Sequence, residues 1–362
     1  MTKSKRYYSI RDDLNDYPDA WCYIICGGRK TGKTYSALLD CLDHNMKHVF
    51  LKRCNNDVNM LCAGNHLGEK GAGYEIDLSP YKAINRDTGE HIKAYKIDEG
   101  LGGFYRATED GSAEGAPVGY VLSLAAVHKF KGFDLSDCDE MIFDEFIPQP
   151  WERTNRKEGE QVMDLYMTVA RDRHLRGKPE LKLICLANAT NVFNYTCEVL
   201  EVTDIIADMT VKGREVFYDE DRGIFIRLLK TPEEMLEDDK KTGMYKSMYN
   251  TAWGRVAFNN EFAYNDFTNV GKLALKQFKP VVSLKYKNKC FYVYLSESKG
   301  YYMCSSPAKC PIEYDLNTDV GQIGFYYDYA LDFRNECVMG RMMFEKYTMY
   351  DMIINYKKRF KV

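Results

Sequence analysis

Short apolar runs alternate with stretches of helical periodicity over the first half of the chain. Runs of strand length occupy residues 21–26, 48–52, 119–125, 140–144 and 181–187. Between the last two, residues 158–174 space their apolar side chains by three and four, which predicts a helix. Strands that alternate with helices predict an α/β fold with a mostly parallel sheet covered by helices.

Two regions depart from this alternation. Residues 63–119 are rich in glycine and turn residues, which predicts an insertion of loops and antiparallel hairpins. From about residue 275 the pattern changes to hairpins over 281–286, 290–295 and 300–304, with a helical stretch over 337–358. We therefore predict a first domain over 1–197, a charged, mainly helical linker or lid subdomain over 198–262, and a smaller α+β domain over 263–362.

Composition indicates the number of domains and the cellular compartment of the protein. A chain of 362 residues with 45% hydrophobic content suits two domains better than one. The N-terminus is polar and no apolar run has the length of a membrane span, so we expect neither a signal peptide nor a membrane partner. The 12 cysteines include no Cys-x-x-Cys pair, which favours buried free thiols in a reducing cytosol.

Net charge gives no general argument for nucleic-acid binding, because 50 basic residues stand against 53 acidic ones. Such binding would use local patches, and the lysine-rich segments 271–290 and 357–361 are the candidates. A solvated surface explains both segments equally well. The 28 tyrosines, with clusters such as 291–294 and 325–329, are better explained by β-sheet packing than by base stacking.

Residues 27–34, Gly-Gly-Arg-Lys-Thr-Gly-Lys-Thr, match the phosphate-loop (Walker A) pattern, and a predicted strand and helix flank them as this motif requires. Gly27 and Gly32 let backbone N–H groups turn toward a phosphate. Lys33 would supply a positive charge, and Thr34 a hydroxyl for Mg²⁺. The expected nucleotide-binding set is Gly27, Gly28, Arg29, Lys30, Thr31, Gly32, Lys33, Thr34 and Tyr35.

A second motif, of Walker B type, ends the buried strand at 140–144 with two adjacent carboxylates. We expect Asp144 to hold Mg²⁺ through water, and Glu145 to act as the general base toward the attacking water. This pair indicates ATP hydrolysis rather than phosphoryl transfer to another acceptor. Asn188 ends a further strand with Thr190 behind it, and is either a sensor of the γ-phosphate or an ordinary turn residue.

Arginines at 171, 173 and 176 lie at the end of the predicted helix. They are either candidates for neutralising transition-state charge in a neighbouring subunit or surface salt-bridge partners.

The arginine inside the glycine loop, together with the sequences at 143–147, 169–173 and 184–189, resembles the DNA encapsidation ATPases of small, protein-primed podoviruses, which are related to large terminases. The resemblance is specific over about 20–195 and weaker around 278–302. It implies an additional-strand (ASCE) P-loop ATPase core that uses ATP and Mg²⁺. It also implies a homomeric ring, expected to be a pentamer, docked on the portal (connector) of a procapsid in the host cytoplasm. The resemblance implies that the ring moves double-stranded DNA. It leaves open whether a packaging RNA is a further partner.

The resemblance also implies residue roles. Lys33 and Thr34 would bind phosphate and magnesium, Asp144 would support the metal, and Glu145 would be the base. Arg171 falls where the family's trans-acting arginine finger lies, and Arg173 is the alternative. A further trans-acting lysine of the family has no counterpart here, because Asn55 stands at the matching place.

The final domain resembles the RNase H-like nuclease of terminases. Lys285 and Tyr286 stand where a metal-binding Asp is expected, so no DNA cleavage is predicted.

Two other functions fit these motifs less well. A nucleotide-gated DNA-binding scaffold would not need Lys33, Asp144 and Glu145 together. Another DNA-translocating or transfer ATPase, of helicase or plasmid-transfer type, should show further helicase motifs and lack the β-rich final domain. The predicted function is therefore ATP-driven movement of double-stranded DNA into a procapsid, with a loop in 63–119 as the expected grip on DNA.

Overall fold

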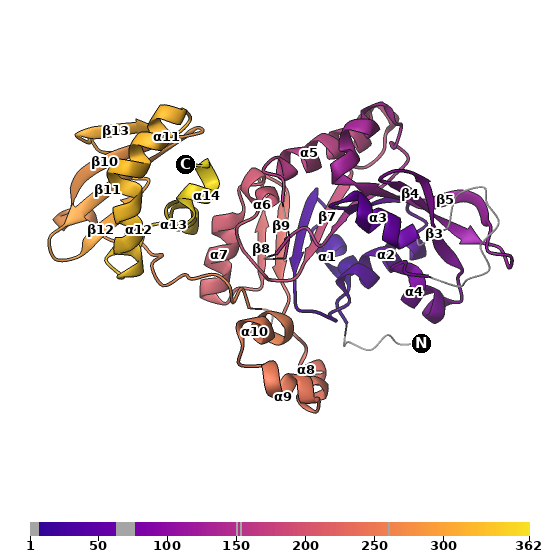
Figure 1. Cartoon of the computed structure of the whole chain (residues 1–362). Helices are drawn as coiled ribbons and strands as arrows, with labels where there is room; N and C mark the ends of the chain where they lie inside the picture. Colours follow the sequence, from indigo (N-terminus) through magenta and orange to yellow (C-terminus); the bar gives the residue numbers. More distant parts are fainter. Residues whose placement is uncertain (1–6, 63–76, 150, 153, 260) are drawn as a thin grey trace. The chain divides into compact units, whose positions relative to one another are not determined.

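The structure is a computed structural model that describes the chain except residues 1–6, 63–76, 150, 153 and 260 (Figure 1). The chain divides into two compact units, Met1–Leu200 with Lys212–Tyr264, and Glu201–Val211 with Asn265–Val362. Each unit has its own sheet and its own apolar core. Among the described residues, no helix is both long enough and apolar enough to cross a membrane.

The first unit is built on a nine-stranded sheet with the order β3-β4-β5-β2-β6-β7-β1-β9-β8. Its six central strands run parallel to one another. These are β5 (Ala113–Ser123), β2 (His48–Lys52), β6 (Glu140–Asp144), β7 (Lys182–Ala187), β1 (Cys22–Cys26) and β9 (Ile224–Leu228). Four of them are nearly continuous apolar runs because they are buried on both faces. The predicted α/β class with a mostly parallel sheet is confirmed.

Helices cover both faces of this sheet. The inward side chains of α1 (Ile10–Asp16), α2 (Lys33–Asp43), α3 (Asn55–Cys62) and α4 (Tyr81–Thr88) share one core with alternate strand residues such as Tyr23 and Phe50. Cys185 of the opposite strand face lies close to Cys197 of α6 (Tyr195–Val199). The α6 helix packs closely against α5 (Glu158–Val169), where a Cβ at Gly159 would meet the Tyr195 carbonyl.

The predicted antiparallel insertion is confirmed for its described part. Strands β3 (Ile92–Asp98) and β4 (Leu101–Ala107) pair antiparallel with each other, and β4 with β5, at one edge of the sheet. Residues 63–76, part of the expected DNA grip, lie outside the described residues. Helix α4 was not predicted, and the strand expected at 119–125 instead spans Ala113–Ser123 and is followed by a 3₁₀ helix over Leu124–Gly132.

The segment expected to be a helical linker is only partly helical. Helices α8 (Glu233–Lys240), α9 (Gly243–Met248) and α10 (Ala252–Asn259) agree with that prediction. However, the hairpin of β8 (Val216–Asp219) and β9 extends the large sheet, because β9 pairs parallel with β1. The sheet thus continues past residue 197, and α7 (Thr203–Lys212) falls almost entirely in the second unit.

The second unit has a five-stranded sheet with the order β13-β10-β11-β12-β14. The predicted hairpins are confirmed as β10 (Lys279–Tyr286), β11 (Lys289–Ser296) and β12 (Gly300–Cys304). Strand β13 (Ile312–Asp315) runs parallel to β10, and β14 (Met342–Phe344) runs parallel to β12.

The final helical stretch begins earlier than predicted, at Asp319 rather than near 337. They are α11 (Asp319–Phe325), a π-helical turn over Tyr326–Ala330, α12 (Leu331–Val338), α13 (Tyr347–Ile354) and α14 (Tyr356–Phe360). The expectation that tyrosines at 325–329 pack within a sheet is therefore wrong. That segment is helical, and Phe325 and Tyr329 contribute to the core between helices and sheet.

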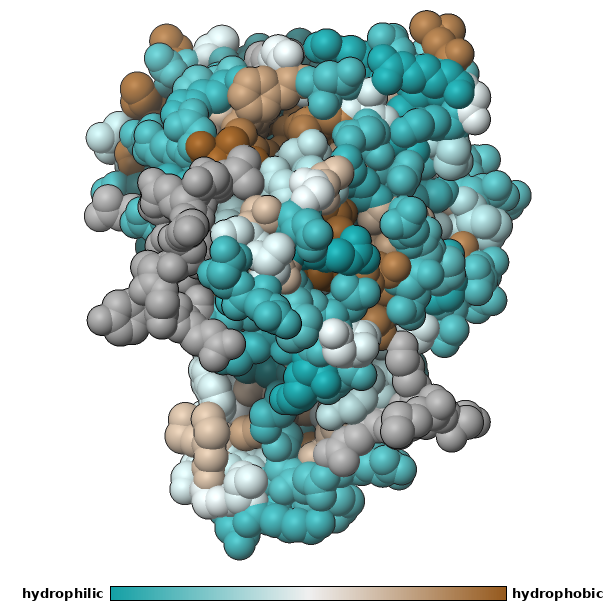
Figure 2. Space-filling view, turned by 90° about the vertical axis from the view of Figure 1, so that its right-hand side faces the viewer, coloured by the Kyte–Doolittle hydropathy of each residue, from teal (hydrophilic) through white to brown (hydrophobic). Residues whose placement is uncertain are grey.

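Figure 2 views the molecule from the side of strands β3–β5. The visible surface is mostly hydrophilic, and hydrophobic side chains gather only in small separate patches. The described residues visible on this face therefore form no broad apolar surface.

Candidate functional site

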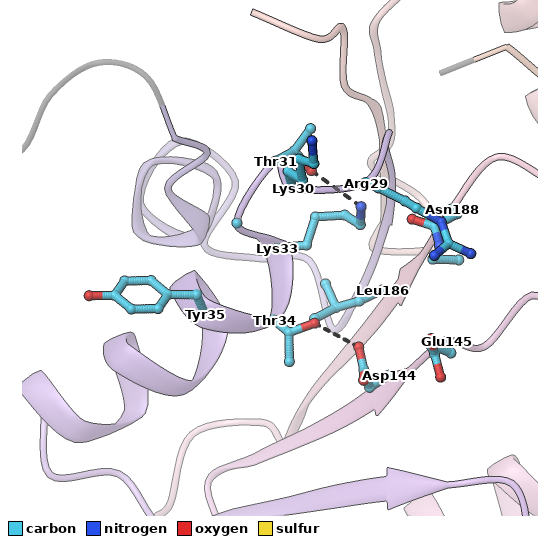
Figure 3. A pocket seen from close by; sticks show the side chains of 12 residues that line it. Arg29, Lys30, Thr31, Lys33, Thr34, Tyr35, Asp144, Glu145, Leu186 and Asn188 are labelled. Atoms are coloured by element: carbon cyan, nitrogen blue, oxygen red, sulfur yellow. Dashed lines mark hydrogen bonds between the residues drawn. The ribbon is translucent and has the colours of Figure 1, made fainter. Parts of the chain in front are cut away.

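The carboxyl edge of the parallel strands carries the candidate site (Figure 3). The glycine loop follows β1, Asp144 ends β6 and Asn188 follows β7, and these three strands are neighbours in the sheet. Ligands of open α/β sheets bind at such an edge. A cavity of about 500 Å³ lies here, lined by Arg29, Lys30, Thr31, Gly32, Lys33, Thr34, Tyr35, Asp144, Glu145, Leu186, Ala187 and Asn188. The structure thus brings together the residues of three separate sequence motifs.

The glycine loop folds around the Lys33 ammonium group. Lys33 Nζ donates hydrogen bonds to the carbonyls of Gly27 at 3.1 Å and Gly28 at 2.8 Å, and to Thr31 Oγ1 at 3.2 Å. Burial lowers the pKa of Lys33 to about 8, because a desolvated ammonium group is disfavoured. Gly32 precedes α2 with φ of 86°, a left-handed conformation that suits glycine.

Thr34 and Asp144 lie side by side in the cavity. Thr34 Oγ1 donates a hydrogen bond to Asp144 Oδ1 at 2.8 Å, which joins the start of α2 to the end of β6. Mg²⁺ prefers oxygen ligands and is commonly held through one or two carboxylates. The hydroxyl and carboxylate oxygens at this position fit such an ion.

Lys52, which the sequence analysis did not assign to the site, ends β2 beside β6. Its Nζ lies 2.7 Å from Asp144 Oδ2 and 3.5 Å from Glu145 Oε2. Burial alone would lower the pKa of Lys52, but Asp144 and Glu145 outweigh burial and raise it. The sequence signal was a lysine at the end of an apolar strand, and its meaning depended on the strand order.

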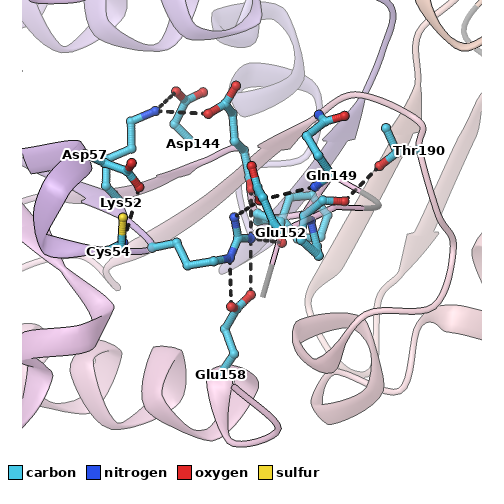
Figure 4. Close-up of polar contacts among 12 residues, drawn as sticks. Lys52, Cys54, Asp57, Asp144, Gln149, Glu152, Glu158 and Thr190 are labelled. Atoms are coloured by element: carbon cyan, nitrogen blue, oxygen red, sulfur yellow. Dashed lines mark hydrogen bonds and ion pairs between the residues drawn. The ribbon is translucent and has the colours of Figure 1, made fainter. Parts of the chain in front are cut away.

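Glu145 lies in a strained backbone segment that Arg53 holds in place. It has φ of 55°, which a residue with a Cβ rarely adopts, and its side chain is 61% exposed at the cavity. The Arg53 guanidinium donates to the backbone carbonyls of Glu145 and Phe146, each at 3.0 Å. The same guanidinium pairs with Glu158 at 2.8 Å and with Glu152 at 2.9 Å. Both carboxylates are labelled in Figure 4.

Other predicted residues take different positions. Tyr35 points away from the phosphate-loop side chains in Figure 3, and its hydroxyl donates to Asp87 at 3.0 Å. Thr190 donates to the Pro148 carbonyl at 3.3 Å, so it braces the segment after β6. Lys30 pairs with Asp239 of α8 at 2.8 Å, which ties the glycine loop to the helical segment α8–α10.

A second, much smaller cavity adjoins the first. Asn188 and Arg29 line both cavities. The other residues of the second are Gln149, Trp151, Thr190, Trp253, Val256, Ala257 and Tyr264. Sequence reasoning missed these aromatic side chains, because they come together only in the folded unit.

The two candidate finger arginines lie at the opposite, amino edge of the sheet. Arg173 is buried and donates to the carbonyls of Cys138 and Pro179 and to Asp139 at 3.2 Å. Asp139 directly precedes β6, so the length of that strand, about 15 Å, separates this edge from Asp144. Arg173 braces its own chain, and its burial corrects the expectation that it is an alternative finger. Arg171, by contrast, is exposed.

The model of the podovirus DNA encapsidation protein (Gp16) family matches residues 113–320, which include Asp144, Glu145, Arg171 and Asn188. The bacteriophage Phi-29 viral genome packaging motor assembly is similar in structure, with a TM-score of 0.60 and 15% identity over 98% of this chain and 100% of that chain. The Phi-28 gp11 DNA packaging motor gives a TM-score of 0.57 and 16% identity over 94% of each chain. No curated protein sequence matches significantly.

Proposed function

The chain belongs to the family of podovirus DNA encapsidation proteins (Gp16), and on that basis we propose that it is the ATP-hydrolysing subunit of a motor that drives double-stranded DNA into a procapsid. The convergence of Lys33, Thr34, Asp144 and Glu145 at one edge of the sheet carries this proposal. Strand β7 lies between β1 and β6, which supports an additional-strand ATPase core.

The proposed chemistry is hydrolysis of the bond between the β- and γ-phosphates of ATP. The glycine loop would cradle the phosphates with its N–H groups, and Lys33 would stabilise negative charge on the γ-phosphate oxygens. Thr34 and Asp144 would hold Mg²⁺, which when bound neutralises phosphate charge. Glu145 would orient a water and accept its proton while water oxygen bonds to the γ-phosphorus and ADP leaves.

Asn188 is the proposed sensor of the γ-phosphate, because it lines the cavity beside Glu145 at the end of the neighbouring strand. Lys52 and Arg53 are proposed to hold the carboxylates and backbone of the β6 end in place.

We further propose that hydrolysis requires a second subunit. Arg171 lies at the amino edge of the sheet, away from the cavity of its own chain, so it would serve only the cavity of another copy. A homomeric ring, with a pentamer as the expected form, satisfies this need for every subunit. It would act in the host cytoplasm while docked on the portal of a procapsid, with a packaging RNA as a further possible component.

The second unit is proposed to lack nuclease activity. Strand β10 presents Lys285 and Tyr286 where a metal-binding Asp is expected. Lys285 pairs in register with Asp315 of β13, and the pKa of Asp315 is lowered by the backbone N–H and side chain of Asn317 and by Lys285. A lysine so close to the carboxylate disfavours a divalent cation there.

The decisive experiment replaces the proposed base by Glu145→Gln and measures ATP hydrolysis with procapsids and DNA present. We expect turnover to fall by about 10²–10⁴-fold, the usual contribution of a general base, while ATP binding persists. Glu160→Gln, an exposed change on α5, is the matched control and should keep wild-type turnover. Unchanged hydrolysis in Glu145→Gln would remove the assigned base. A wild-type protein that binds ATP without turnover would favour the scaffold function.

A further inference from the structure

The nucleotide cavity has two ends of different chemistry. Glu145 and Asn188 lie at one end of the set of lining residues, and Tyr35 lies at the other. Lys33 and Thr34 lie between them, as Figure 3 shows. The proposed hydrolysis places the γ-phosphate of ATP beside Glu145. Because the three phosphates form an extended chain, the nucleoside of ATP would then emerge at the end of the cavity near Tyr35.

Tyr7 lies against the glycine loop at the point where the loop enters α2. A Cβ atom placed on Gly32 would be 3.4 Å from both Cβ and Cδ1 of Tyr7, so the tyrosine ring begins directly beside the loop. Gly32 lines the cavity and directly precedes α2, whose first turn contains Tyr35. Tyr7 is nevertheless 57% exposed. The ring is thus seated on the lining of the cavity and is open to a ligand.

Hydrogen bonds hold the backbone around Tyr7 in place. The backbone N–H of Tyr8 donates to the carbonyl of Thr31 in the glycine loop at 3.1 Å. The backbone N–H of Ile10 donates to Ser36 Oγ of α2 at 2.8 Å. The segment that carries the Tyr7 ring is therefore fixed to the loop and to the helix before any ligand binds. Such preorganisation lowers the cost of binding.

Tyr35 supplies a second aromatic ring to this end of the cavity. It directly follows Thr34, and it points away from the side chains around Lys33 in Figure 3. Its hydroxyl donates to Asp87 of α4 at 3.0 Å, which orients the ring. Nucleobases stack on aromatic side chains, because every base presents a π face. Two tyrosines at the nucleoside end of the cavity therefore suit a base better than a further phosphate.

We infer that the Tyr7 ring forms the stacking wall of a nucleobase subsite, which Tyr35 borders on the side of α2. The inference rests on the proposed function for the presence of a nucleoside triphosphate in the cavity. Stacking recognises the face of a base rather than its pattern of donors and acceptors. The subsite therefore takes purine and pyrimidine bases, and prefers purines for their larger ring system.

The test compares a ligand that has a base with one that lacks it. Binding of a slowly hydrolysed ATP analogue and of inorganic tripolyphosphate, each with Mg²⁺, is measured by titration calorimetry on the full chain. Tyr7→Leu should weaken binding of the ATP analogue by about 5–100-fold and leave tripolyphosphate binding unchanged. Tyr7→Phe keeps the ring and should bind both ligands as wild type does. Tyr327→Leu, at a tyrosine of the second unit that is 74% exposed, is the control and should change neither.

Equal weakening of both ligands in Tyr7→Leu would show that Tyr7 only supports the glycine loop, and would overturn the inference. Unchanged binding of the ATP analogue in that variant would also overturn it. Lys33→Ala tests the proposed function separately, because loss of the phosphate-binding lysine should weaken both ligands. Binding of both ligands by Lys33→Ala as by wild type would count against the glycine loop as the phosphate site, and the Tyr7 result would still decide the nucleobase subsite.

A photolabel locates the base directly. An azido-ATP with its reactive group on the purine ring is bound to the full chain, and the labelled residues are identified by mass spectrometry. We expect labelling within residues 7–11 or at Tyr35. Labelling of Trp253 or Tyr264, which line the second cavity, would place the base there and overturn the inference.

Discussion

The two edges of the large sheet hold their cations in different ways. At the carboxyl edge, Lys33 is held by loop oxygens, and Lys52 and Arg53 by carboxylates and carbonyls of the β6 end. At the amino edge, Arg173 is just as firmly held, but Arg171 is exposed. The comparison teaches that the cavity is arranged by its own chain, whereas the far edge has exposed arginines, Arg171 among them.

The largest effect is expected from Arg171→Ala, which tests the role of the amino edge. We expect hydrolysis in the assembled motor to fall by about 10³–10⁵-fold, the usual contribution of an arginine finger, with no change in folding. Mixing Arg171→Ala with Glu145→Gln subunits should restore part of the activity, because each supplies what the other lacks. Arg106→Ala, on the exposed face of β4, serves as the control. Absence of any restoration would show that Arg171 does not act across subunits.

A second change separates the two arginines of the amino edge. Arg173→Met removes the partner of Asp139 and leaves two carbonyls without their donor, so we expect a loss of about 3–5 kcal/mol and a lower Tm. Arg171→Met should alter stability by less than about 0.5 kcal/mol. Thermal unfolding followed by circular dichroism measures both. An unchanged Tm in Arg173→Met would reopen its role as a finger.

A third change addresses the carboxyl edge. Lys33→Ala should lower hydrolysis by about 10²–10³-fold, since it removes a preorganised donor from the developing charge. Binding of a fluorescent ATP analogue should weaken as well. Lys30→Ala, one turn of the loop away and paired with Asp239, should have a much smaller effect. Equal losses of hydrolysis in the two variants would show that Lys33 has no special role among the lysines of the loop.

The smallest expected effect is a dependence of nucleotide binding on pH. The pKa of Lys33 is lowered to about 8, so its positive charge is present below that pH and is lost above it. Raising the pH from 7.5 to about 9 should therefore weaken binding several-fold, whereas a lysine with its usual pKa near 10.4 would stay charged. Titration calorimetry across this range measures the effect. Lys33→Met should abolish the dependence, and persistence of it there would assign it to another group.

The sequence predicted those features that depend on neighbouring residues. Strands β1, β2, β6 and β7 are continuous apolar runs, and the glycine loop follows one of them, so local pattern was sufficient. The roles of Lys52 and Arg53 depend on β2 lying beside β6, which no local pattern reveals. Burial of Arg173 likewise depends on where α5 ends. The aromatic segment at 325–329 was misassigned because short apolar runs suit helices and strands alike.

The position of β1 in the sheet also sets the order in which the protein can be built during synthesis. Strand β1 pairs with β7 and β9, so Ile24 finds its partners at Cys185 and Ile226. At about 5–20 residues per second, a ribosome needs about 10–40 s to pass from the glycine loop to the end of β9. The loop that would grip ATP is therefore among the first segments to be made and among the last to gain its support, and an unfinished chain cannot yet form a working nucleotide site.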